Sequence, residues 1–250
     1  YLDASDVEQY AWTTSWGVST RLIGGLIMTH SDDDGLIVPP RLAPLHVVIL
    51  PVIHDDQARG EVMDYCGKLA AALRDQAYAG RPVQVRIDDR DIRGGEKTWA
   101  WIKKGVPLRV EVGPRDIASD SVFVGRRDRD PKDRVSMKRG EFVATVAAQL
   151  DQMQRCLYER ALAFRQANTR RIDSLDEFRA FFTPANPDKP EIHGGFALCH
   201  YNGSVEVEKR VQEELNVTIR CLPLDAADEP GTCIFTGQPS ARRALFAKAY

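Results

Sequence analysis

The chain has 250 residues, a length that allows one large or two ordinary domains, each with its own core. Its hydrophobic share of 43% and charged share of 28% are ordinary for a soluble globular protein. The formal net charge of -2 indicates no class of partner, because a nucleic-acid binder needs to be basic only where it touches phosphate. No apolar run approaches the roughly 20 residues that a membrane-spanning helix needs, so we expect no membrane partner.

Five cysteines are scattered along the chain without a CxxC pair: Cys66, Cys156, Cys199, Cys221 and Cys233. An odd and dispersed set favours a reducing compartment, with the cytoplasm as the default. The first residues carry neither a basic nor an apolar leader pattern, and the chain does not begin with methionine. We therefore expect a cytoplasmic protein whose sequence here starts inside a longer gene product.

The first of three segments covers residues 1–44. An aromatic stretch at 10–21 precedes an apolar run at 22–28, which could be a strand or a helix because short apolar runs are ambiguous on periodicity alone. The acidic stretch 31–35 ends in Asp-Gly, which predicts a turn.

The second segment, 45–135, alternates between strand and helix patterns. The β-branched run at 46–51 is typical of a buried strand, and apolar residues recur at helical spacing from 55 to 79. The expected elements are a strand at 46–51, a helix at 55–79 ended by Gly80, a strand at 83–87, a short helix at 98–104, and strands at 108–112 and 121–125. This order predicts a small α/β domain.

The third segment begins with a long helix, expected at 137–167. Ser174, with Glu177 three residues later, is typical of a helix N-terminus and predicts a second helix through Phe182. Residues 183–190 hold three prolines and are expected to form a loop. Beyond them the patterns predict a strand at 195–199, a helix at 205–215 and a strand at 218–222.

Taken singly, the motifs in these segments are weak. The planar fork of Arg21 suits phosphate oxygens or stacking on a base, but a surface ion pair is the plainer alternative. The run Asp32 to Asp34 could bind a divalent cation, or it could be a solvated turn. Arginines and carboxylates at 86–91 and 109–116 suit the reading of base edges and suit surface salt bridges equally well.

In combination the motifs are more specific. The stretch Thr14 to Gly24, followed by Met28 to Leu36 and by Pro39-Pro40-Arg41, resembles signature motif 3 of class II prolyl-tRNA synthetases, in the branch found in archaea, eukaryotes and some bacteria. The stretches 88–90, 104–107 and 111–116 look like the anticodon-binding domain of that family, and the third segment resembles its C-terminal appendix.

The resemblance implies an α/β (α+β) fold in three parts. These are the end of a class II antiparallel catalytic sheet at 1–44, a mixed-sheet α/β anticodon-binding domain at 45–140, and a linking helix with a small α/β C-terminal domain at 141–250. It also implies a proline–tRNA ligase that uses ATP with Mg²⁺ to activate L-proline and transfers it to tRNA(Pro), as a homodimer.

Individual roles follow from the same resemblance. The catalytic residue would be Arg21, which would contact ATP together with Ser19 and Thr20. The proline pocket would be closed by Ser15, Trp16 and Gly17. The anticodon would be met by Glu111, Arg115 and Asp116, with Arg126 and Arg127 as phosphate contacts. The carboxylate of Tyr250 would support the active site.

Two departures from the family limit this interpretation. The four positions that often hold structural zinc are Asn202, Val207, Cys233 and Thr236 here, and one soft ligand cannot make a tetrahedral site, so we predict no metal. Motifs 1 and 2 are absent, so we expect the chain alone to be inactive.

Two alternative functions stay open at this stage. The first is a non-catalytic tRNA-binding module derived from the synthetase. The second, a doubly wound nucleotide-binding protein, is weaker because the chain lacks a GxGxxG or GxxxxGK[ST] fingerprint.

Overall fold

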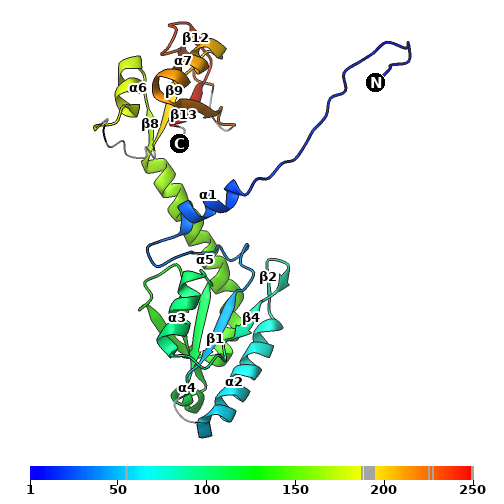
Figure 1. Cartoon of the computed structure of the whole chain (residues 1–250), viewed down its shortest axis with the longest axis vertical. Coiled ribbons are helices and arrows are strands. Elements are labelled where there is room, and N and C mark those ends of the chain that lie inside the picture. Colours follow the sequence, from blue (N-terminus) through cyan, green and yellow to red (C-terminus); the bar gives the residue numbers. More distant parts are fainter. Residues whose placement is uncertain (54–55, 187, 189–194, 225, 227, 249–250) are drawn as a thin grey trace. The chain divides into compact units, whose positions relative to one another are not determined.

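The computed structural model describes residues 1–53, 56–186, 188, 195–224, 226 and 228–248. The chain divides into two compact units, Tyr1–Glu159 and Arg160–Tyr250. The division falls inside the long helix α5, Arg139–Ala167 (Figure 1). Each unit has its own sheet and its own apolar core.

The apolar run of the first segment is a helix, α1 (Arg21–His30), which settles the ambiguity left by its pattern. The Asp-Gly turn is confirmed, because the backbone N–H groups of Asp32 and Gly35 each donate to the other residue's carbonyl at 3.1 Å. Residues 1–44 contribute two isolated bridges and no strand of a larger sheet. The expected end of a catalytic sheet therefore stays a prediction.

The sheet of the first unit has five strands in the order β4-β1-β5-β6-β7. Its members are β1 (Val47–Pro51), β4 (Val85–Ile87), β5 (Leu108–Val112), β6 (Ser121–Arg126) and β7 (Arg134–Lys138). The first three strands in this order are parallel, and β6 and β7 continue the sheet antiparallel. The mixed α/β class is thus confirmed.

Strand β1 is buried on both faces because helices cover both sides of it. Val47 and Ile49 share a cluster with α2 (Asp56–Arg74) and with the first half of α5. Val48 and Leu50 pack with Trp101 of α3 (Gly94–Lys103) on the other face. The continuous apolar run at 46–51 is what such a two-sided environment demands.

Three helix predictions were wrong at their ends: the helix expected at 98–104 is α3, which already starts at Gly94, and two others ran into residues that form strands. Helix α2 stops at Arg74, and the hairpin of β2 (Ala77–Tyr78) and β3 (Arg81–Pro82) follows, so Gly80, at φ +79, belongs to the hairpin turn. Similarly, α5 starts at Arg139, because 134–138 pairs with β6 as β7. In both places, pairing with a second strand overrides the local helical spacing.

The sheet of the second unit has the order β10-β13-β9-β8. Its strands are β8 (Thr169–Arg171), β9 (Phe196–His200), β10 (Val217–Cys221) and β13 (Arg243–Lys248); a small hairpin of β11 (Gly231–Thr232) and β12 (Pro239–Ser240) lies apart from it. Strands β8 and β13 had no counterpart among the predicted elements.

Two helices complete this unit, α6 (Leu175–Phe182) and α7 (Val205–Leu215). The predicted cap is confirmed, since the Ser174 hydroxyl accepts from the Glu177 N–H at 3.2 Å. The ring of Phe178 contacts the rings of Phe182, Phe235 and Phe246 with centroids 4.9, 5.0 and 5.4 Å away. Across the residues described in both units, no helix is long and apolar enough to cross a membrane.

Candidate nucleic-acid interface

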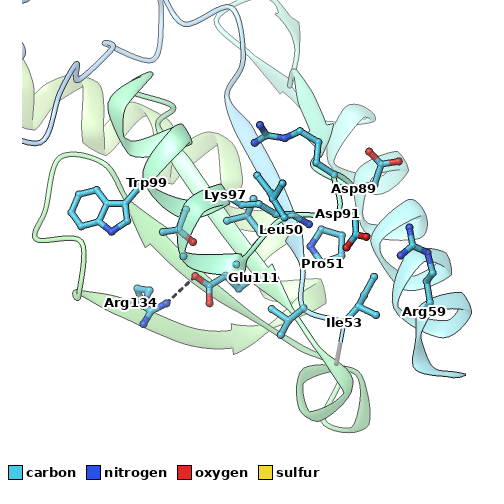
Figure 2. A pocket seen from close by; sticks show the side chains of 16 residues that line it. Leu50, Pro51, Ile53, Arg59, Asp89, Asp91, Lys97, Trp99, Glu111 and Arg134 are labelled. Carbon is cyan, nitrogen blue, oxygen red and sulfur yellow. Dashed lines mark hydrogen bonds and ion pairs between the residues drawn. The ribbon is translucent and has the colours of Figure 1, made fainter. Parts of the chain in front are cut away.

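The carboxyl ends of β4, β1 and β5 meet at one edge of the first sheet. The chain leaves β1 toward β4 on one side and later returns to β5 on the other, so the order switches at β1. Such a switch point opens a crevice beyond the strand ends, where α/β folds bind ligands. A pocket of about 670 Å³ lies here, lined by the residues after β1 and β4, by the start of α3, and by Glu111 and Arg134 (Figure 2).

Glu111 and Arg134 form an ion pair on one wall of this pocket. Arg134 Nη1 donates to Glu111 Oε1 at 2.8 Å, and the guanidinium lies over the ring of Phe123, 4.8 Å from its centroid. Both side chains are partly exposed, so a ligand can reach them. A carboxylate beside a guanidinium presents acceptors and donors together, which suits the edge of a nucleobase.

Trp99, on α3, is also one of the residues that line the same pocket (Figure 2). The residue as a whole is about half exposed, at 47%. An exposed aromatic ring beside a pocket with polar walls is the usual platform on which an unpaired base stacks.

A buried carboxylate holds Arg90 at the rim. Asp88 accepts from Arg90 Nε at 2.7 Å, from Arg90 Nη2 at 2.6 Å and from Trp101 Nε1 at 2.7 Å. The hydrogen bonds from Arg90 hold the pKa of Asp88 well below its usual range despite burial, so the carboxylate stays charged. This network fixes the direction of the loop after β4.

Arg109, two residues before Glu111, adds positive charge behind the pocket wall. It is buried, and neither of its terminal nitrogens has a hydrogen-bond partner among the described residues. Burial, together with the charge of Arg127, lowers the pKa of Arg109 to about 10. A buried guanidinium without a partner is costly, and its charge favours an anionic ligand on this side of the sheet.

Three of the predicted anticodon residues come together around a second, smaller hollow. Glu111, Arg115 and Asp116 line it with Phe123, and Glu111 also belongs to the larger pocket. Arg115 is exposed at the first turn of α4 (Pro114–Ala118), and Asp116 Oδ2 accepts from the Gly113 N–H at 2.9 Å. Their role toward RNA stays a prediction.

The two predicted phosphate contacts line neither of these hollows. Arg126 donates to both carboxylate oxygens of Asp128 and to Gln152. Arg127 is 1% exposed, and its fork is directed at Asp32 and Gly35. Both guanidinium groups are therefore already hydrogen-bonded within the chain.

The predicted ATP and proline residues lie before and at the start of α1. Ser15, Trp16, Gly17 and Ser19 are exposed in extended chain, Thr20 is the residue that precedes the helix, and Arg21 is its first residue. The Leu22 and Ile23 N–H groups at the helix start already donate to the Ser19 and Thr20 carbonyls at 3.1 and 3.0 Å, so the exposed Arg21 guanidinium is the group that fits a phosphate. Tyr250 lies outside the described residues.

The four zinc-related positions are also placed. Val207 is buried in the core, and the Cys233 thiol donates to Asn202 Oδ1 at 3.6 Å. Burial acts to raise the pKa of this thiol, but hydrogen bonds from Thr236 and from backbone groups outweigh it and lower the pKa. Within the ranges that the structure describes, no three His, Cys, Asp or Glu side chains gather as metal ligands. The expected lack of zinc stays a prediction.

Comparison with known proteins identifies the domain that carries the pocket. Residues 46–149 match the family model described as "Anticodon binding domain". The five-stranded sheet and the pocket at its edge therefore belong to a domain of the anticodon-binding class.

Matches over the remaining residues and over the whole chain narrow the class of protein further. Residues 189–250 match the model "Prolyl-tRNA synthetase, C-terminal". Among similar proteins are proline–tRNA ligase 2 of Anaeromyxobacter dehalogenans, 53% identical over 100% of this chain and 50% of its own length, and the proline–tRNA ligase of Bdellovibrio bacteriovorus, 52% identical over 100% and 49%. The proline–tRNA ligase of Rhodopirellula baltica is 54% identical over 99% and 48%. The chain is thus similar over its whole length to these ligases, and it spans about half the length of the curated relatives it matches.

Proposed function

We propose that the chain is the part of a proline–tRNA ligase that supplies motif 3, anticodon recognition and the C-terminal domain. The enzyme would activate L-proline with ATP and transfer it to tRNA(Pro). The observation that carries this proposal is the pocket with Glu111, Arg134 and Trp99, set in a domain that matches the anticodon-binding family. We also assign the chain to the branch found in archaea, eukaryotes and some bacteria, on its motif order.

Guanine recognition is the chemistry that the pocket suits. Proline codons begin with two cytosines, so the anticodons that match them carry adjacent guanines. A guanine offers O6 and N7 to an arginine, and its N1–H and N2–H groups to a carboxylate. Glu111 and Arg134 hold both kinds of group 2.8 Å apart. Arg115 and Asp116 would extend the contact along the strand ends.

At the other end of the unit, Arg21 would offset the charge of ATP, with Ser19 and Thr20 beside it. ATP would supply the adenylyl group that activates the proline carboxylate, with pyrophosphate as the leaving group, and Mg²⁺ would arrive with ATP. Ser15, Trp16 and Gly17 would form one wall around the proline ring, and the Tyr250 carboxylate would support the site. We further propose a homodimer that works in the cytoplasm.

Binding of an anticodon stem-loop tests the carrying observation. We expect this chain to bind a stem-loop with the proline anticodon and to lose roughly 10-fold or more in affinity when either guanine is replaced, as a lost base contact costs about 1–3 kcal/mol. Glu111→Gln should weaken binding and reduce that discrimination. The matched control is Glu141→Gln, which removes the charge of an exposed carboxylate at the start of α5. Equal affinity for both stem-loops would overturn the assignment of the pocket.

Pyrophosphate exchange tests the division of labour. The intact protein should show exchange that depends on proline, and Arg21→Ala in that protein should remove most of it. We expect none from residues 1–250 alone. Proline-dependent exchange by these residues alone would disprove the view that they are one part of the enzyme.

A further inference from the structure

The turn that follows α1 is fastened to the anticodon-binding unit by a buried arginine. Arg127 Nη1 donates to Asp32 Oδ2 at 2.7 Å, and Nη2 donates to Asp32 Oδ1 and to the Gly35 carbonyl. Arg127 Nε donates to the carbonyl of Ile102 at 3.0 Å, near the end of α3. A single guanidinium therefore joins the turn after α1, the end of β6 and the end of α3.

The backbone of the same segment lies directly on the end of α3. The Leu36 N–H donates to the Lys103 carbonyl at 3.1 Å, and the Val38 N–H donates to the Gly105 carbonyl at 3.2 Å. The approach is close enough to require Gly105, at φ +72, because a Cβ atom there would lie 2.4 Å from the Leu36 carbonyl oxygen. The two backbone segments are therefore packed so closely that the contact depends on a glycine at this position.

Helix α3 also forms part of the candidate RNA pocket. Its Thr98 and Trp99 line that pocket, and the same two residues line a neighbouring hollow of about 350 Å³ together with Asp34. Asp34 lies in the same turn as Asp32, the turn that the ion pair with Arg127 holds in place. One short helix therefore contacts the pocket along its length and the turn after α1 at its end.

The electrostatics make the fastening strong. The hydrogen bond from Arg127 holds the pKa of Asp32 below its ordinary value, so the carboxylate is charged at neutral pH. Asp32 is the one carboxylate within ion-pair distance of Arg127 among the described residues. Removing it would leave a guanidinium buried without a countercharge, which proteins avoid.

We propose that Asp32 and Arg127 are positioning residues that hold α1, with Arg21 at its start, in a fixed place relative to the anticodon pocket. A tRNA bound through its anticodon would then have its acceptor end oriented for reaction at the catalytic residues. Neither residue contacts a substrate in this view. The inference rests on the proposed function.

The test compares two RNA substrates of the intact protein. One is full-length tRNA(Pro), and the other is a minihelix that carries the acceptor stem without an anticodon. For Asp32→Asn we expect kcat with full tRNA to fall roughly tenfold, the scale on which residues between coupled sites act, with KM nearly unchanged. Minihelix charging and proline-dependent pyrophosphate exchange should stay within about twofold of the unchanged protein.

Two further variants make the result interpretable. Asp33→Asn makes the same charge change on an exposed carboxylate in the same turn, and it should behave like the unchanged protein. Arg127→Lys keeps a donor for Asp32 but loses the fork, so it should show the same split in smaller measure. It also keeps the test usable if Asp32→Asn folds poorly.

Three outcomes would overturn the inference. These are a D32N enzyme equal to D33N on both substrates, an equal loss on full tRNA and minihelix, or a loss confined to stem-loop affinity. If the unchanged intact protein does not charge tRNA(Pro) at all, the proposed function fails first, and that result is separate from the three above.

Discussion

His46, at the start of β1, shows how the fold controls the ionisation of one residue. Its side chain is fully buried, with Nδ1 accepting from the Gln84 N–H at 3.0 Å and the Tyr78 ring edge-on to it at 5.5 Å. Burial, and then the nearby charge of Arg81, lower the pKa of His46 from 6.5 to about 4. The ring is therefore neutral in the folded protein at neutral pH.

This depressed pKa predicts a loss of stability in mild acid. In the unfolded chain, His46 binds its proton more tightly than in the folded protein. The contribution of the neutral His46 ring to stability is therefore complete above pH 6.5 and is lost as the pH falls toward 4. The loss from this residue should reach about 3 kcal/mol at most, since one pKa unit corresponds to about 1.4 kcal/mol. Urea unfolding at pH 7.5 and 4.5 measures it. His46→Gln is the control, and an equally steep loss in that variant would contradict the assignment to His46.

At this scale the sequence predicted residues that the fold brings together, while their role toward RNA stays a prediction. Glu111, Arg115 and Asp116, carried over from the resemblance, do line one hollow together. Arg134 was missed, because its contact with Glu111 exists only once β7 pairs with β6, which pairs with β5. Trp99 was missed because a tryptophan on a short helix is as common in a core as at a pocket, and Trp101, two residues on, is indeed buried.

Among the elements, α6 begins at an N-terminal cap, Ser174, that the sequence predicts. Ser174 has extended backbone, and its hydroxyl accepts from the Glu177 N–H. We expect Ser174→Ala to lower the free energy of unfolding by about 1 kcal/mol, the usual contribution of such a cap. Ser174→Asp, which can also cap, should stay close to the original protein. Denaturant unfolding of the three proteins measures the difference, and equal losses in both variants would show that the hydroxyl itself has no capping role.

Elements with local signals were predicted, and elements defined by distant partners were not. The strand 108–112 and the helix 205–215 were found with their full bounds, since alternation in one and helical spacing in the other are complete within the segment. Strand β13 lies between β9 and β10 in its sheet, and no clear alternation marks it in the sequence. Strand β8, three residues long, exists only through its pairing with β9.

Over the whole chain, the order of the domain types could be predicted, because the order of the motifs is read directly from the sequence and requires no knowledge of contacts. The expected boundaries at 44 and 140 stay a prediction; the matched domain spans 46–149, and the compact units divide at Glu159. Long helices such as α5 carry one continuous pattern across a domain limit, so the sequence alone gives no signal there.

The pairing of charges near the pocket predicts that RNA binding depends only moderately on salt. Two arginines near the site, Arg90 and Arg134, are paired with carboxylates. For single-stranded RNA, each phosphate contact contributes about 0.7 to the slope of log affinity against log salt. We therefore expect a slope well below that of a protein bound through many phosphates.

Two matched variants locate the phosphate contacts. Arg115→Gln removes an exposed charge beside the pocket and should reduce the slope of stem-loop binding by about 0.7. Arg126→Gln removes one charge as well, but that guanidinium is already held by Asp128 and Gln152, so the slope should not change. Titration of labelled stem-loop at several salt concentrations measures both. A reduced slope in Arg126→Gln alone would instead assign the phosphate contact to the end of β6, because only a residue that displaces counterions from the RNA can alter the salt dependence.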